Sequence, residues 1–268
     1  MPISRILLFS TILFCTSFAA CSPVKKSNTT LKVLFVGNSL TYVGNLPAVL
    51  DALGGSNGKS IQSDMLVKGG ATLTQRVTDG TVSLALSSKK YDYVVLQERG
   101  GDVTCAFGPK SCKDAESSLL VLAKTVVLNG ATPIYLGTYQ ALPEASKALV
   151  NFESSMAARN SIAYIPVSNF FLSALHKNPE SDWLYSDGMH PGPDLILLEA
   201  VLLYRNIYNE LPGNADLLVS APMYIPSSKF SDPSPTSQSI NLSDLPAGHK
   251  YQSTTISKVL QLVKQERQ

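Results

Sequence analysis

The strongest constraint on the fold is a series of short apolar runs, rich in β-branched residues, that alternate with longer helix-like segments. Such runs are typical of parallel strands that are covered on both faces. Because successive parallel strands are joined by right-handed crossovers, the series predicts an α/β protein, a three-layer α/β/α sandwich around a five-stranded parallel sheet. The expected strands are Leu31–Gly37, Ile61–Val67, Tyr91–Gln97, Thr132–Tyr139 and Ala163–Val167.

Helix-like segments of fitting length lie between and after these runs. One of them ends at Asn129-Gly130, a typical C-terminal stop, and another is introduced by Pro191-Gly192-Pro193. The length of 268 residues fits one large domain, which we expect over residues 31–268. The expected helices are approximately Asn45–Leu53, Leu73–Leu86, Asp114–Asn129, Glu144–Asn160, Asp194–Tyr208 and Thr255–Gln265.

Residues from about Pro212 to Gly248 differ from the rest, because they are rich in Ser, Pro and Asn and have few long apolar runs. We expect a surface excursion. Two interpretations stay open: a loop that wraps the surface without a chemical role, and a cover over part of a substrate cleft.

The N-terminal segment is typical of an export signal, since Arg5 precedes a short apolar stretch that ends in small residues. The stretch is too short for a comfortable membrane span, which needs about 20 apolar residues. We therefore expect a signal peptide over residues 1–20 and a polar tether over residues 21–30.

The end of this segment, Phe18-Ala19-Ala20-Cys21, resembles the lipobox of bacterial lipoproteins, whose cysteine is lipidated and becomes the new N-terminus. Ordinary secretory cleavage near Ala20 is the alternative. Acyl chains on Cys21 would hold the protein at a bilayer without a spanning helix. The expected location is the cell envelope, at the outer membrane or facing the periplasm in a Gram-negative organism; without the lipid anchor the protein would be secreted.

Ser39 stands directly after the first apolar run, where it ends abruptly. A serine hydroxyl is a weak nucleophile unless a histidine takes its proton and a carboxylate orients that histidine. His190 is the best candidate of the three histidines, because Asp187 precedes it by three residues and one loop can hold both. The sequence therefore predicts the catalytic residues Ser39, Asp187 and His190; the other interpretation of Asp187 is a residue that only caps a turn.

The segment Gly37-Asn38-Ser39-Leu40 resembles the first conserved block of the SGNH, or GDSL-type, hydrolases, with Asn in place of the usual Asp. The segment Asp187–Pro191 resembles their last block, and the resemblance extends over about residues 31–208. It implies a flavodoxin-like fold, the same three catalytic residues, and ester hydrolysis through an acyl-enzyme. The α/β-hydrolase elbow Gly-x-Ser-x-Gly is not present, because Thr41 stands at its second glycine.

The family also implies three donors to the oxyanion: the serine N–H, a glycine N–H after the second strand and an asparagine side chain after the third. Gly70 fits the glycine position best, although a plain strand-to-helix turn also explains it. The asparagine is missing; Gln97 would present an amide from nearly the same place, and strict alignment puts Arg99 there. We expect an oxyanion hole of Ser39, Gly70 and Gln97. Because loss of one donor typically lowers the rate about 100- to 1000-fold, the replacement bears on rate and substrate more than on reaction class.

Cys105 and Cys112 flank a short segment with a Gly108-Pro109 turn. In an exported protein this spacing predicts a disulfide. A metal site is the poorer interpretation, because no histidine lies nearby. No ligand cluster or Gly-x-Gly-x-x-Gly motif after the first strand indicates a metal or an organic cofactor.

The net charge of +2 and a charged fraction of 16% predict no nucleic-acid partner. The expected function is that of an exported serine esterase that hydrolyses an acyl or acetyl ester, of a small molecule or of a glycan, with membrane contact only through the lipid anchor. One alternative is a lysophospholipase or thioesterase, which a long apolar channel beside Ser39 would favour. Another is a noncatalytic envelope protein that keeps the fold to bind glycans or partners.

Overall fold

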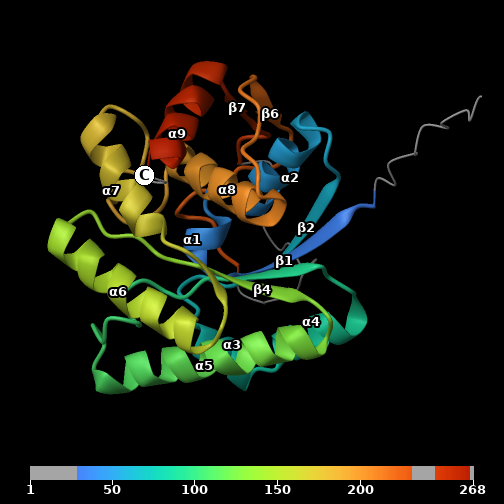
Figure 1. Ribbon diagram of the computed structural model, residues 1–268, viewed down its shortest axis with the longest axis vertical. Helices are drawn as coiled ribbons and strands as arrows, with labels where there is room; N and C mark the ends of the chain where they lie inside the picture. Colours follow the sequence, from blue (N-terminus) through green and yellow to red (C-terminus); the bar gives the residue numbers. More distant parts are fainter. Residues whose placement is uncertain (1–28, 231–244, 266–268) are drawn as a thin grey trace, which may run out of the picture.

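The computed structural model describes residues 29–230 and 245–265, and its centre is the predicted five-stranded parallel sheet (Figure 1). The strands pair in the order β2-β1-β3-β4-β5, and all neighbouring strands are parallel. Their bounds are β1 Leu31–Gly37, β2 Ile61–Val67, β3 Tyr93–Leu96, β4 Thr132–Leu136 and β5 Ala163–Ile165. The predicted fold class is confirmed, and β1 and β2 have the predicted bounds.

The last three strands end earlier than predicted. β5 has three residues, and β4 pairs with it only up to Leu136 and Ile165, so the chain leaves the sheet after Leu136. Gln97 and residues 137–139 therefore lie in loops, not in strands. These loops follow the carboxyl ends of the strands, where open parallel sheets place their ligand sites.

The alternation of side chains along β1 explains the two helical layers. Val33 and Phe35 point to the apolar cluster that contains α2, α7, α8 and α9, whereas Leu34 and Val36 point to the cluster that contains α3, α4, α5 and α6. Figure 1 shows these two sets of helices on opposite faces of the sheet. All four side chains are fully buried, so β1 is covered on both faces.

Nine helices accompany the sheet in the described ranges. Helices α2, α6, α8 and α9 lie within three residues of their predicted bounds, and α5 begins five residues before its predicted start. They are α1 Ser39–Tyr42, α2 Leu46–Ser56, α3 Leu73–Thr78, α4 Thr81–Ser88, α5 Pro109–Leu128, α6 Pro143–Arg159, α7 Val167–Lys177, α8 Pro193–Tyr208 and α9 Ser253–Gln265.

Two helix predictions need correction. A single helix over Leu73–Leu86 is wrong, because Asp79 ends α3 and its carboxylate accepts the backbone N–H and hydroxyl of Thr81, at 3.0 and 2.6 Å, where α4 begins. Helix α7 and the four-residue helix α1 were not predicted. Helix α7 begins at Val167, the last residue of the predicted fifth strand, and only Pro166 separates it from β5.

The interpretation of Pro212–Gly248 as a surface excursion is wrong for its first part. Strand β6, Leu217–Val219, pairs antiparallel with β7, His249–Tyr251. Tyr224 and Phe230 are buried and pack together edge to face. Hydrogen bonds also tie this segment to the first helices, from the Tyr42 hydroxyl to Ser228 O (3.1 Å) and from Asn45 Nδ2 to Pro222 O (2.8 Å). Residues 231–244 lie outside the described residues.

The predicted signal peptide and the tether up to residue 28, with the predicted lipidation site Cys21, also lie outside the described residues. Thr29 and Thr30 are exposed and lead into β1 without regular structure. Within the described ranges, no helix combines the length and the apolar character that crossing a bilayer requires.

A buried carboxyl group joins α6 to the sheet. The Glu153 carboxyl accepts hydrogen bonds from the backbone N–H and hydroxyl of Thr138, at 2.9 and 3.1 Å, and from the hydroxyls of Tyr135 (3.3 Å) and Tyr164 (2.8 Å). Burial raises the pKa of Glu153 to about 7. Thr138 lies at the carboxyl end of β4, so this network fixes the start of the β4–α6 loop.

The replacement Glu153→Ala should lower the free energy of unfolding by about 3 kcal/mol, because it leaves buried hydroxyl and N–H groups without an acceptor. The measurement is a urea unfolding curve for each variant. The control is Ser155→Ala, an exposed position in the same helix, which should change the free energy of unfolding by less than about 0.5 kcal/mol. Equal effects of the two replacements would contradict the structural role of Glu153.

Candidate active site

Ser39 begins α1 directly after β1, and the Asn38 side chain fixes this corner. Asn38 Oδ1 accepts the backbone N–H of Leu40 (3.0 Å), and Asn38 Nδ2 donates to Ala71 O (3.1 Å). The second bond joins the loop after β1 to the loop after β2. A carboxylate could not donate it, which gives a physical reason for Asn in place of the Asp that is usual in the SGNH first block.

Gly70 lies in the loop after β2 with a φ of 66°, a left-handed conformation that favours glycine. The described residues supply no acceptor for the backbone N–H groups of Ser39 and Gly70. Both groups are therefore available to an oxyanion.

The Glu98 side chain also fixes the loop after β2, a role that the sequence did not predict. Its buried carboxyl accepts the backbone N–H of Leu73, at 3.1 and 3.2 Å from its two oxygens, and that of Arg99 at 2.8 Å. Burial raises the pKa of Glu98 to about 7. The two loops and the end of β3 thus form one hydrogen-bonded unit.

Asp187 and His190 interact as predicted from their spacing. Asp187 Oδ2 lies 2.6 Å from His190 Nδ1, and Asp187 Oδ1 accepts the backbone N–H groups of Met189 (2.9 Å) and His190 (3.0 Å). These bonds, that from the His190 N–H above all, lower the pKa of Asp187 to about 2, so Asp187 is ionised at neutral pH. With Nδ1 held by Asp187, Nε2 is the ring nitrogen that can serve a nucleophile.

Tyr139 lies just after β4 and contacts the same loop. The sequence predicted it only as the last residue of the fourth strand. Its hydroxyl donates to Met189 O at 2.8 Å, and its ring packs edge to face on Phe171, with 5.2 Å between the ring centroids. The backbone next to His190 is therefore tied to the sheet and to α7.

One cavity of about 410 Å³ brings most of these segments together. Ser39, Gly70 and Arg99 line it from the strand ends, and Gly188 and Met189 line it from the loop of His190. None of residues 212–230 lines it. The contact between the Ser39 hydroxyl and the His190 imidazole stays a prediction, as does the triad that depends on it.

Gln97 and Arg99, the two candidates for the third oxyanion donor, occupy different environments. Gln97 is buried and does not line the cavity; its Oε1 accepts the Thr41 hydroxyl at 2.6 Å, and its Nε2 has no partner among the described residues. Arg99 lines the cavity, and its Nε and Nη2 donate to the two carboxylate oxygens of Asp102 at 2.8 and 3.0 Å. The position of Arg99 therefore suits contact with a substrate better, and the role of Gln97 stays a prediction.

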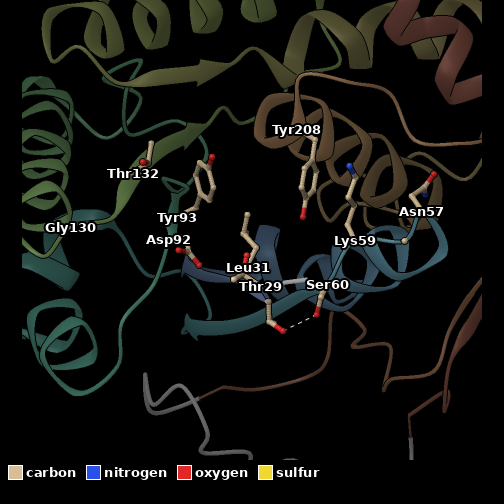
Figure 2. A pocket seen from close by; sticks show the side chains of 12 residues that line it. Thr29, Leu31, Asn57, Lys59, Ser60, Asp92, Tyr93, Gly130, Thr132 and Tyr208 are labelled. Atoms are coloured by element: carbon tan, nitrogen blue, oxygen red, sulfur yellow. Dashed lines mark hydrogen bonds between the residues drawn. The ribbon is translucent and has the colours of Figure 1, made fainter. Parts of the chain in front are cut away.

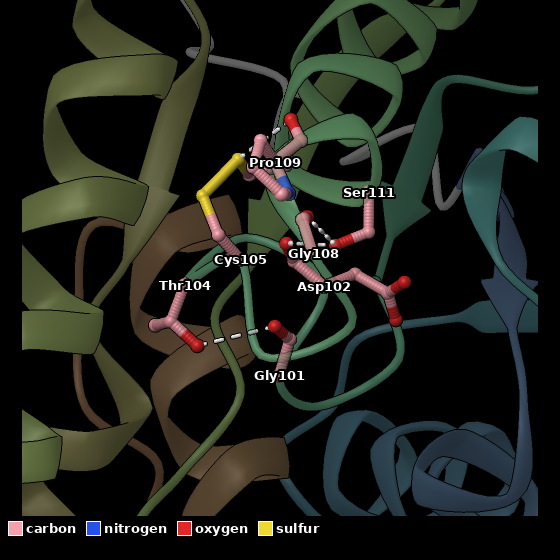
Figure 3. The surroundings of a disulfide bond; sticks show 8 residues. Gly101, Asp102, Thr104, Cys105, Gly108, Pro109 and Ser111 are labelled. Carbon is pink, nitrogen blue, oxygen red and sulfur yellow. Dashed lines mark hydrogen bonds between the residues drawn. A yellow bond between two sulfur atoms is a disulfide. The ribbon is translucent and has the colours of Figure 1, made fainter.

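A disulfide joins Cys105 and Cys112 at the start of α5 (Figure 3). It closes the loop between β3 and α5, in which the Thr104 hydroxyl donates to Gly101 O (3.1 Å). This loop contributes Gly100 and Phe107 to the lining of the cavity. No group of three potential metal-ligating His, Cys, Asp or Glu side chains occurs in the described part of the chain.

A larger pocket of about 650 Å³ lies at the opposite edge of the sheet (Figure 2). It is lined by the first residues of three strands, Leu31, Tyr93 and Thr132, with Lys59 and Tyr208 beside them. The amino ends of parallel strands are far from the edge that carries Ser39. This pocket is therefore not the candidate active site, although it is larger than the cavity beside Ser39.

Solved structures that match this fold include esterases and SGNH hydrolases. A proposed SGNH hydrolase from Slackia heliotrinireducens matches with a TM-score of 0.53 and 20% identity over 67% of this chain and 100% of that chain. The acetyl xylan esterase AlAXEase matches with a TM-score of 0.55 and 17% identity over 66% and 100%. The esterase EstA from Pseudoalteromonas sp., inhibited by monoethylphosphonate, matches with a TM-score of 0.52 and 18% identity over 66% and 97%.

No protein-family model and no curated protein matches the sequence. At identities of 17–20% the structural likeness concerns the fold. The chain has the fold of the SGNH, or GDSL-type, hydrolases, and the resemblance predicted from the sequence is confirmed at this level.

Proposed function

We propose that this protein is an exported serine esterase in which Ser39 is the nucleophile, His190 the general base and acid, and Asp187 the residue that orients His190. The observation that carries the proposal is the cavity that Ser39 and Gly70 share with the loop of His190. The short Asp187–His190 contact and the low pKa of Asp187 support it, because they fix the imidazole in one orientation.

In the first half of the reaction, Ser39 Oγ bonds to the ester carbonyl carbon while its proton passes to His190 Nε2. The carbonyl oxygen becomes negative and faces the N–H groups of Ser39 and Gly70. The bond between the carbonyl carbon and the alcohol oxygen then breaks, and the alcohol leaves with the proton from His190. In the second half, a water molecule passes a proton to His190 and its oxygen bonds to the carbonyl carbon. The bond between that carbon and Ser39 Oγ then breaks, the acid leaves, and His190 returns the proton to Ser39 Oγ.

The substrate would be an acyl or acetyl ester of a small molecule or a glycan. A structural neighbour that is an acetyl xylan esterase supports an acetylated carbohydrate. The runner-up, a lysophospholipase or thioesterase, is supported by the apolar side chains Leu40 and Phe171 in the cavity. The rival class, a noncatalytic binding protein, is supported by the missing oxyanion asparagine.

Covalent labelling tests the proposal. A fluorophosphonate probe should modify the mature protein once, at Ser39, as read by intact mass and peptide mapping, because only an activated serine reacts at a useful rate. Ser39→Ala should abolish the labelling, whereas Ser154→Ala on α6 should not change it. Absence of labelling under conditions that fully label a control esterase would favour the noncatalytic alternative.

Arg99 is our choice for the third group at the oxyanion. Arg99→Leu should lower kcat by about 100-fold, since loss of one oxyanion donor typically has this effect. Gln97→Leu should lower kcat less than tenfold and instead reduce the free energy of unfolding by about 1–3 kcal/mol, because it leaves the buried Thr41 hydroxyl without its acceptor. Steady-state kinetics and urea unfolding of both variants decide, with Arg159→Leu on the surface of α6 as control. The reverse pattern would assign the donor to Gln97.

Export and lipid anchoring through Cys21 are part of the proposal. The Cys105–Cys112 disulfide supports export, because such bonds persist in oxidising compartments. Cys21→Ser should move the protein from the membrane fraction to the soluble fraction of an expressing bacterium, as read by fractionation and immunoblot. Retention of the variant in the membrane fraction would contradict the anchor.

A further inference from the structure

The wall of the cavity next to the nucleophile is hydrocarbon. Leu40 follows Ser39 in the chain and is largely buried. Phe171 of α7 is fully buried and packs on the ring of Tyr139, and all three side chains line the cavity. Apolar side chains from α1 and α7 therefore line the cavity together with Ser39.

Apolar side chains also form the rim. Phe107, Leu142 and Met189 line the cavity with exposed fractions of 59, 69 and 61%. They come from three separate loops, yet they are three of the nine large apolar side chains that are exposed in the described part of the chain. Exposed apolar side chains that gather around one cavity mark a binding surface, whereas isolated ones need no explanation.

Contacts within its own loop hold the Phe107 part of the rim in place. The Arg99 guanidinium carbon lies 4.3 Å from the centroid of the Phe107 ring. A Cβ at Gly101 would come within 3.3 Å of the same ring, so glycine permits this close approach. Phe107 lies in sequence between the two cysteines of the Cys105–Cys112 disulfide, which closes this loop (Figure 3). A wall that is already ordered loses little entropy when a ligand binds.

We infer that this apolar wall binds the acyl chain of the substrate, and that the preferred chains are hydrocarbons of about four to eight carbons, not acetyl. The inference rests on the proposed function. The acyl part is favoured over the alcohol part because Leu40 follows Ser39, whose Oγ bonds to the acyl carbon, and because Leu40 and Phe171 offer hydrocarbon and no partner for the hydroxyls of a glycan. Each methylene buried on this wall should raise kcat/KM about fourfold.

The test is kcat/KM of the mature protein for the 4-nitrophenyl esters of acetate, butanoate, hexanoate and octanoate, which share one leaving group. We expect hexanoate to exceed acetate by at least tenfold. Equal values for all four esters, or the highest value for acetate, would overturn the inference.

A matched pair of variants locates the effect. Leu142→Ser should lower the ratio of hexanoate to acetate kcat/KM at least fivefold, because it removes an apolar side chain from the rim. Leu84→Ser, on α4 and away from the cavity, is the control, with an exposed fraction of 71% against 69% for Leu142. The control ratio should match that of the unmodified protein. The same ratio in both variants would overturn the placement of the chain.

Alkyl fluorophosphonates separate failure of this inference from failure of the proposed function. The rate constant for labelling of Ser39 should rise with the alkyl length of the probe, as kcat/KM does for the esters. Labelling of Ser39 together with a preference for acetate would leave the esterase proposal standing and overturn only the acyl-chain assignment. If no probe labels Ser39 and no ester is hydrolysed, both proposals fail.

Discussion

Parallel pairing of β1 with β2 on one side and β3 on the other is the constraint on which the candidate site depends. It brings the carboxyl ends of three strands to one edge, so the residues that follow them, Ser39, Gly70 and Arg99, line one cavity although they are distant in sequence. The hydrogen bonds of Asn38 and Glu98 then fix the loops relative to each other. The positions of Ser39, Gly70 and Arg99 thus depend on the strand pairing and on the two buried side chains of Asn38 and Glu98.

The part of the candidate site that contains His190 depends on a loop that is not part of the sheet. Asp187 organises it by accepting two backbone N–H groups and by contacting His190 Nδ1. The loop is anchored at its base by the pairing of Leu184 with Pro191, and from the sheet by the Tyr139 hydroxyl. A carboxylate that already accepts two N–H groups stays ionised, and an ionised carboxylate fixes the orientation of the imidazole beside it.

The sequence predicted the strands well, because a parallel strand buried on both faces needs an apolar run that few other structures require. It also predicted the Asp187–His190 contact, since a spacing of three residues within one loop is a local property. What it could not predict depends on tertiary packing. The guanidinium of Arg99 pairs with Asp102, and the segment around Tyr224 is buried although its composition is that of a loop. The apolar rim brings Phe107 and Leu142 together from separate loops, so no local pattern marks it.

The cavity therefore combines the backbone N–H groups proposed for the oxyanion with apolar side chains, and both serve catalysis only if the imidazole reaches the serine. The most direct measurement is a crystal structure of the mature protein after reaction with a phosphonate probe. We predict that phosphorus is bonded to Ser39 Oγ, with His190 Nε2 within hydrogen-bonding distance and a phosphonyl oxygen facing the N–H groups of Ser39 and Gly70. A well-ordered structure in which His190 points away from an unmodified Ser39 would contradict the account.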